Sequence, residues 1–321
     1  PEQIHFLNVS QVADLDAGAL DDLDENQVAG LDVDVLHALT GEQLAAVVDE
    51  LTGEQIGELT ADQFNDLDQD VLDSLSDGQI VGISAAALNG LSGDQIGAII
   101  EGLTPDQIGA LEPEKLAELD ENALDALNED QVAALSHEAI AALDEDQLGL
   151  IVGDLSGDQI ASLTTEDVAK LSVDAIGELS ADQVSSLTST ALAAFDADQL
   201  AALDEDQIAS LSVKALKGLS AEDIAELDPD SVTGLTEKQI GSLNSSQVAG
   251  FTSEQLDALD EDQVGAFTAS AIAGFSGEDL DAMLVDLTDN QISGLTAAQI
   301  EGISADTLDD LDDSQIQAFT K

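Results

Sequence analysis

Runs of three acidic residues are the groups best suited to do chemistry in this 321-residue chain. Carboxylate oxygens at this density suit Ca²⁺, although the EF-hand loop pattern with its Gly and terminal Glu is absent. In the other interpretation these acids cap helices and interact favourably with helix N-termini. We favour the capping role and predict no specific metal site. The runs are 144–146, 204–206 and 260–262, and 24–26 and 128–130 are close to the same pattern.

Catalytic groups are sparse. The three histidines, His5, His37 and His137, lie far apart in the sequence, whereas a catalytic or metal constellation needs unlike residues that converge in one pocket. The chain has no Cys, which excludes disulfides, thiolate nucleophiles and zinc–thiolate sites. We therefore predict no catalytic, cofactor-binding or metal-binding residues and no enzyme activity. Ca²⁺ is the one ligand left open.

The charge is extreme. There are 69 acidic and six basic residues, so the formal net charge is −63. Such a chain repels a phosphate backbone and an anionic membrane surface. No apolar run approaches the roughly 20 residues of a membrane span. The sequence thus predicts no nucleic-acid partner and no membrane insertion. Its 44% of hydrophobic residues is too high for a disordered acidic tail.

An eight-residue repeat organises the chain from Asn8 to Phe319 in 37 octads, whose positions we label a to h. Residues 204–211 form a well-developed octad. Position a is Ser, Thr, Asp or Asn in 36 octads, with Glu112 as the exception, and positions e and h are apolar in all 37. Position d is Gln in 21 octads and Ala in eight.

Each octad is predicted to be one short capped helix. The apolar spacing averages 4.0 residues, which does not fit a continuous helix of 3.6 residues per turn, and it lacks the alternation of a strand. Residue a is then the N-cap, and Gln at d completes a capping box. Pro105, Pro113 and Pro229 lie at position b, the first helical residue, which tolerates proline. Extending the frame backwards places Pro1 at b as well.

Four inserts of four residues, 48–51, 100–103, 152–155 and 284–287, interrupt the octads. We interpret each as one added helical turn. They follow octads 5, 11, 17 and 33, which are all odd, so two octads per coil would place them on one side; a non-integer winding is the alternative. Short helices are marginal alone and must bury e and h against neighbouring coils. The predicted fold is all-α, a single continuous, rod-shaped octad-repeat α-solenoid over residues 1–321.

The unit Leu-Thr-x-x-Gln-Ile-x-x-Leu, seen at residues 51–59, resembles octad repeats of very large secreted or surface bacterial proteins. These are described as adhesin-like or haemagglutinin-like. The resemblance covers essentially the whole chain. It implies an extracellular or cell-surface location and a scaffold, stalk or filament role, and it carries over no catalytic residue.

The sequence therefore predicts a non-enzymatic extracellular structural protein, a fibre subunit or an adhesin stalk. Residues 1–7 and 319–321 lack a polar capping repeat, which favours head-to-tail contact between copies as the partner interaction. The alternative is an acidic binding module that captures Ca²⁺ or a basic protein along its flank.

At a net charge of −63 the native fold repels itself, so counterions are expected to stabilise it. The melting temperature should rise when salt or millimolar Ca²⁺ is added to protein in a low-salt buffer. Circular dichroism melts in the two solutions test this, and an unchanged melting temperature would contradict it.

Overall fold

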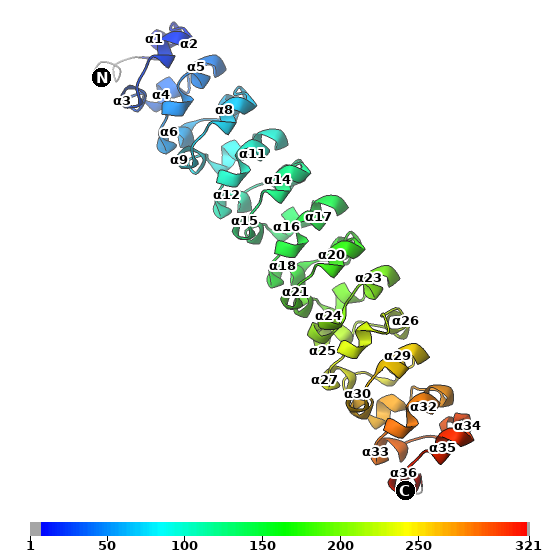
Figure 1. Ribbon diagram of the computed structural model, residues 1–321. Helices are drawn as coiled ribbons and strands as arrows, with labels where there is room; N and C mark the ends of the chain where they lie inside the picture. The colour runs from blue at the N-terminus through cyan, green and yellow to red at the C-terminus, as the bar shows by residue number, and fades with distance from the viewer. Residues whose placement is uncertain (1–7, 320–321) are drawn as a thin grey trace. The chain divides into compact units, whose positions relative to one another are not determined.

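The computed structural model describes residues 8–319 (Figure 1). All regular structure in this range is helical, which confirms the predicted all-α repeat solenoid. The chain divides into two compact units, residues 1–155 and 156–321, and each is described by itself. The single continuous domain over residues 1–321 stays a prediction. Pro1, His5 and Lys321 lie outside the described residues.

The helices are short, and nearly every octad supplies one. In the first unit they are α1 (Val9–Ala13), α2 (Ala17–Asp21), α3 (Glu25–Val28), α4 (Val33–Leu36), α5 (Gly41–Ala45), η2 (Val48–Glu50), α6 (Gly53–Glu58), α7 (Ala61–Asn65), α8 (Gln69–Asp73), α9 (Asp77–Ile80), α10 (Ala85–Leu88), α11 (Gly93–Ile99), η3 (Ile100–Gly102), α12 (Pro105–Gly109), α13 (Pro113–Ala117), α14 (Glu121–Asp125), α15 (Glu129–Ala133), α16 (His137–Ala141), α17 (Glu145–Ile151) and η4 (Val152–Asp154).

The second unit continues the pattern. It contains α18 (Gly157–Ser162), α19 (Thr165–Ala169), α20 (Val173–Gly177), α21 (Ala181–Ser186), α22 (Ser189–Leu192), α23 (Ala197–Ala201), α24 (Glu205–Ser210), α25 (Val213–Leu216), α26 (Ala221–Ala225), η5 (Ser231–Gly234), α27 (Glu237–Ile240), α28 (Ser245–Val248), α29 (Ser253–Ala258), α30 (Glu261–Ala266), α31 (Ala269–Ile272), α32 (Gly277–Met283), η6 (Leu284–Asp286), α33 (Asp289–Ile292), α34 (Ala297–Gly302), α35 (Ala305–Asp309) and α36 (Asp313–Ala318).

The predicted caps are confirmed. At α24, Asp204 Oδ1 accepts the Gln207 N–H at 2.8 Å, and Gln207 Oε1 accepts the Asp204 N–H at 3.0 Å. This reciprocal pair satisfies two donors that the helix start would leave unpaired. Pro105 and Pro113 begin α12 and α13 as predicted.

Pro229 departs from the prediction, because octad 228–235 forms only the 3₁₀ helix η5. Here the Asp228 side chain accepts the Asp230 N–H at 2.8 Å. A side chain that bonds two residues ahead favours a turn over a helix start. Position d holds Ser231 in place of Gln, so no capping box competes with this turn.

Glutamine at d has a second role that the repeat pattern did not reveal. Gln255 is fully buried, and its Nε2 donates to the carbonyls of Ile224 at 2.8 Å and Leu227 at 2.7 Å. Within residues 43–147 and within 199–315, every Gln at d donates in this way to the element four positions earlier, when each insert counts as one element. Each of these amides therefore joins one coil to the next.

The predicted two octads per coil are wrong. Within each unit most helices pack against the element three positions on, as α6 with α9 and α12 with α15 (Figure 1), while the glutamines reach the fourth. A coil therefore holds between three and four elements, the non-integer winding. The physical reason is that an insert does more than lengthen its helix: 48–51 contains its own 3₁₀ turn, and its Val48 and Leu51 carbonyls receive Gln79 as an octad's would.

The core follows positions e and h. In octad 196–203, for example, Leu200 and Leu203 are each 1% exposed. Burying one such side chain contributes about 1.5–3 kcal/mol. Toward the limits of the described range burial weakens: Leu15 is half-buried and Ile316 is 50% exposed. Such loss is expected where a repeat has a neighbour on one side only.

Gln255→Glu keeps the capping oxygen but replaces the donating amide by a carboxylate that faces two carbonyl oxygens. The free energy of unfolding should fall by about 2–4 kcal/mol, because a buried charge is left unpaired. The matched control is Gln27→Glu. Gln27 caps α3 in the same way, but no described element lies four positions before it.

Urea denaturation followed by circular dichroism measures both variants. The control should lose less than about 1 kcal/mol. Equal losses in the two variants would show that the amide link between coils adds nothing.

Candidate functional site

The acidic runs lie at helix starts. Their first residues, Asp144, Asp204 and Asp260, each accept the N–H of the Gln three residues on, at 2.9, 2.8 and 2.7 Å. The second and third residues of each run lie in the exposed first turn. Asp24 and Asn128 cap α3 and α15 in the same way. The capping interpretation is therefore confirmed.

Nowhere in residues 8–319 do three or more His, Asp or Glu side chains converge as metal ligands would. His37 Nε2 lies 2.7 Å from the Glu58 carbonyl oxygen, a contact between helices of successive coils. His137 is the first residue of α16, and His5 lies outside the described range. The structure thus brings none of the described histidines into a constellation with the acidic runs.

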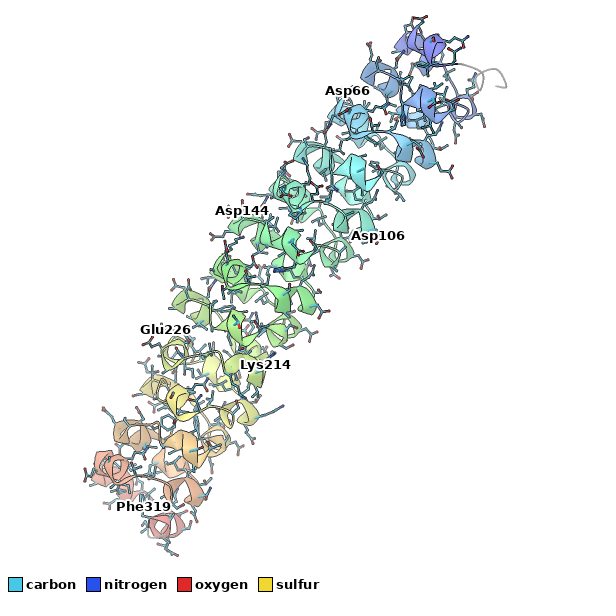
Figure 2. The ribbon with its side chains drawn as sticks, turned by 180° about the vertical axis from the view of Figure 1, so that it is seen from behind. Asp66, Asp106, Asp144, Lys214, Glu226 and Phe319 are labelled. Carbon is cyan, nitrogen blue, oxygen red and sulfur yellow. The ribbon has the colours of Figure 1, made fainter. Side chains whose placement is uncertain are left out.

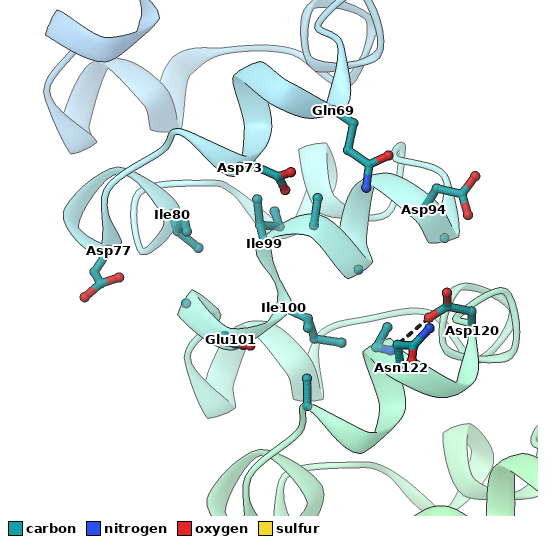
Figure 3. A pocket seen from close by; sticks show the side chains of 16 residues that line it. Gln69, Asp73, Asp77, Ile80, Asp94, Ile99, Ile100, Glu101, Asp120 and Asn122 are labelled. Atoms are coloured by element: carbon teal, nitrogen blue, oxygen red, sulfur yellow. Dashed lines mark hydrogen bonds between the residues drawn. The ribbon is translucent and has the colours of Figure 1, made fainter.

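One groove lies in the first unit beside insert 100–103 and measures about 790 Å³ (Figure 3). Ile80, Ile99 and Ile100 contribute apolar side chains to its lining, and Gly97 and Gly102 line it as well. Carboxylates of successive coils surround it: Asp73, Asp77, Asp94, Glu101 and Asp120. Of these, Asp120 is already a cap, because its Oδ1 accepts the Ala123 N–H at 2.8 Å. The other polar side chains of the lining are the amides of Gln69 and Asn122, so the groove offers electrostatics and hydrogen bonds rather than a nucleophile.

Two further grooves lie between helix starts of different coils. One, of about 360 Å³, is lined by Asp120, Glu121, Asp144 and Asp146. The other, of about 390 Å³ in the second unit, brings two of the acidic runs together through Glu205, Asp206, Asp260 and Asp262. These two runs begin 56 residues apart in the sequence. A coil of two octads would not predict that they lie side by side.

Two octads without Gln at d borrow a cap from another coil. The Glu112 N–H donates to Asn89 Oδ1 at 2.7 Å, and Asn89 Nδ2 donates to the Ala110 carbonyl at 2.8 Å. In the same way the Ser304 N–H donates to Asp281 Oδ1 at 2.7 Å. The partner lies four elements earlier in both cases. This bond explains how a helix can begin at Glu112, the exception at position a. In the sequence, these two octads are marked by Lys115 and Thr307 at position d.

Two carboxylates at helix starts, Asp281 and Asp312, have shifted pKa values. The Ser304 backbone N–H, assisted by the Thr307 hydroxyl, lowers the pKa of Asp281. The Gln315 backbone N–H and the Ser314 hydroxyl lower the pKa of Asp312, the cap of α36. A lowered pKa in the folded state means that each cap stabilises the fold above its ordinary pKa and loses this effect as the pH falls.

Comparison with known proteins gives partial matches. The family model described as the ALTTAQ repeat matches residues 237–269, which supports a repeat protein. No curated protein matches the chain. A similar solved structure is the RNA-binding domain of yeast Puf5p bound to SMX2 RNA, with 17% identity, a TM-score of 0.22, and coverage of 88% of this chain and 79% of that one.

The predicted partner set is corrected in its exclusion of nucleic acid, because this neighbour is bound to RNA. The exclusion rested on a net charge summed over the whole chain, whereas binding depends on local surface. The termini that were to join lie largely outside the described residues. A likeness at this TM-score carries no argument about what this chain itself binds. Among residues 8–319 no helix is both long and apolar enough to cross a membrane.

Asn89→Ala removes the bonds from Asn89 to the Ala110 carbonyl at the end of α12 and to the Glu112 N–H at the start of α13. We expect the free energy of unfolding to fall by about 1–2 kcal/mol, because two hydrogen bonds between coils are lost. Asn26→Ala, at an exposed position c of α3, is the control and should stay within about 0.5 kcal/mol of the parent. Thermal and urea unfolding measure the stability of both variants. An Asn89→Ala variant as stable as the parent would show that the borrowed cap does not stabilise the fold.

Proposed function

We propose that this chain is a non-enzymatic structural spacer in an extracellular or cell-surface bacterial protein, as a stalk or filament segment. The observation that carries the proposal is the amide link between coils, repeated along both compact units. A protein whose recurring polar side chains are used to join one coil to the next is organised around continuity rather than around one pocket.

The energetics of the repeat fit a spacer. Within each unit most elements contact the third element along the chain, and octads with Gln at d also reach the fourth, so stability depends on near neighbours and length can change by whole elements. The caps use the Ser, Thr, Asp and Asn side chains of position a. The high acid content keeps such a surface soluble and disfavours unspecific association. The resemblance of residues 51–59 to repeats of large secreted proteins supports the location.

A second candidate is an acidic module that captures a basic protein. The observation that favours it is the groove in the second unit, lined by Glu205, Asp206, Glu237, Asp260 and Asp262 with no basic residue among its lining groups. Long-range attraction to such a groove would weaken steeply with salt. A specific saturable complex with a basic peptide at physiological salt would place this candidate ahead of the spacer.

A spacer must tolerate a change of length. Deletion of residues 196–227 removes four whole octads and lets Gln239 face the Ile176 and Leu179 carbonyls in place of Ile208 and Leu211. In an optical trap, this variant should unfold at the parental force and release about 110 Å less contour length, at about 3.4 Å per residue.

The matched control deletes residues 196–225, which is two residues short of four octads and misaligns caps and carbonyls at the junction. It should unfold at lower force than the 196–227 deletion. If both deletions lower the force equally, the chain is not additive in its repeats and the spacer proposal fails.

A further inference from the structure

Four octads of the second unit contain no acidic residue, although the chain as a whole carries 69. They are 188–195, 212–219, 244–251 and 268–275, and we call them together the acid-free stripe. Only one other octad, 84–91, lacks Asp and Glu. The four starts are separated by 24, 32 and 24 residues, that is by three, four and three octads.

These steps are the ones by which the solenoid places elements next to each other. Helix α22 packs against α25, and α28 packs against α31. Gln247 of α28 joins the two pairs, because its Nε2 donates to the carbonyls of Leu216 at 2.8 Å and Leu219 at 3.1 Å. The acid-free stripe is therefore continuous on the surface, in the same way that residues spaced by three and four form one face of a helix.

Consecutive elements of the acid-free stripe pack closely, and the stripe is built from small residues. A Cβ at Gly218 would collide with the Ser189 carbonyl oxygen, and one at Gly274 with that of Ser245, so glycine permits backbone contact between consecutive elements of the strip. Its exposed residues include Thr190, Ser246 and Ser270, together with alanines. No large side chain among these would hold a flat partner away.

Two lysines make the local charge of the acid-free stripe positive. Lys214 is exposed on α25 (Figure 2). Lys217 is exposed directly after α25, and Lys238 is exposed on the adjacent α27. None of the three forms an ion pair within 4.0 Å among residues 8–319, whereas Lys115 and Lys170 each have an acidic neighbour. The octads on either side are strongly acidic: 196–211 and 220–235 each carry five carboxylates.

We propose that the acid-free stripe is a docking surface for an acidic protein segment, whose carboxylates face Lys214 and Lys217. Elsewhere on the second unit such a segment meets carboxylates and is repelled. On the stripe it meets two cations and neutral hydroxyl groups, and at physiological ionic strength the flanking charges are screened beyond about 8 Å.

Carboxylate fits this surface better than nucleic acid. The chain has no Arg, the side chain that grips phosphate in a bidentate fork. Phe195, Phe251 and Phe275, which belong to the stripe, are buried and offer no face on which a base could stack. Lysine ammonium groups, as compact point charges, suit separate carboxylates on a polypeptide.

Fluorescence anisotropy of labelled octaglutamate with the whole chain at 0.15 M NaCl tests the proposal. We expect saturable binding that weakens by about threefold in Lys214→Glu and about tenfold in Lys214→Glu/Lys217→Glu. Lys214→Arg should bind as the parent does. Lys115→Glu is the matched control: it changes the net charge by the same amount as Lys214→Glu, lies off the stripe, and should leave binding unchanged.

Circular dichroism melts verify that each variant folds. No binding by the parent, or equal weakening by Lys115→Glu and Lys214→Glu, would overturn the proposal. It would also be overturned if labelled octauridylate bound more tightly than octaglutamate and was lost in the same variants. The same holds if sedimentation showed that the stripe pairs with a second copy of the chain and thereby blocks the peptide.

Discussion

The structure depends on one interaction, the donation of a buried glutamine amide into the carbonyls of the preceding coil. Helices of four to seven residues are too short to persist alone. Apolar burial at e and h holds coils together but does not set their register. Gln255, fully buried, fixes its own helix start through Oε1 and an earlier helix end through Nε2. Cap, helix end and winding are thus set by a single side chain type.

The local structure could be predicted from the sequence and the winding could not. Caps, short helices and the positions of Pro105 and Pro113 follow from propensities within one octad. The coil depends on contacts between residues 24–31 apart, which no local rule reveals. One signal was available: no octad has Glu at d, although Glu completes a capping box as well as Gln does and acids abound. An amide donor at d accounts for this preference for Gln over Glu, although Asp167, Asp223 and Asp279 complete capping boxes without one.

The candidate sites, too, could be predicted from the sequence only in their local structure. The acidic runs were correctly interpreted as caps, because one helix start suffices to predict that role. Their meeting in a groove, as Asp206 and Asp262 do, depends on the winding and was missed. The acid-free stripe is also invisible without the winding, since its octads are 24 and 32 residues apart. Surface chemistry in a solenoid is therefore readable from sequence only after the number of elements per coil is known.

The inserts fit a winding near three and a half elements per coil. In the first unit they recur every 52 residues, which is six octads and one insert, or seven elements. Seven elements complete two coils at this winding, so successive inserts return to the same side. An insert keeps only what the next coil requires, an apolar pair three residues apart and free carbonyls, as Ile100 and Leu103 offer to Gln131. Four residues are enough for an element because the insert follows directly on the preceding helix without a side-chain cap, and the amide comes from the next coil.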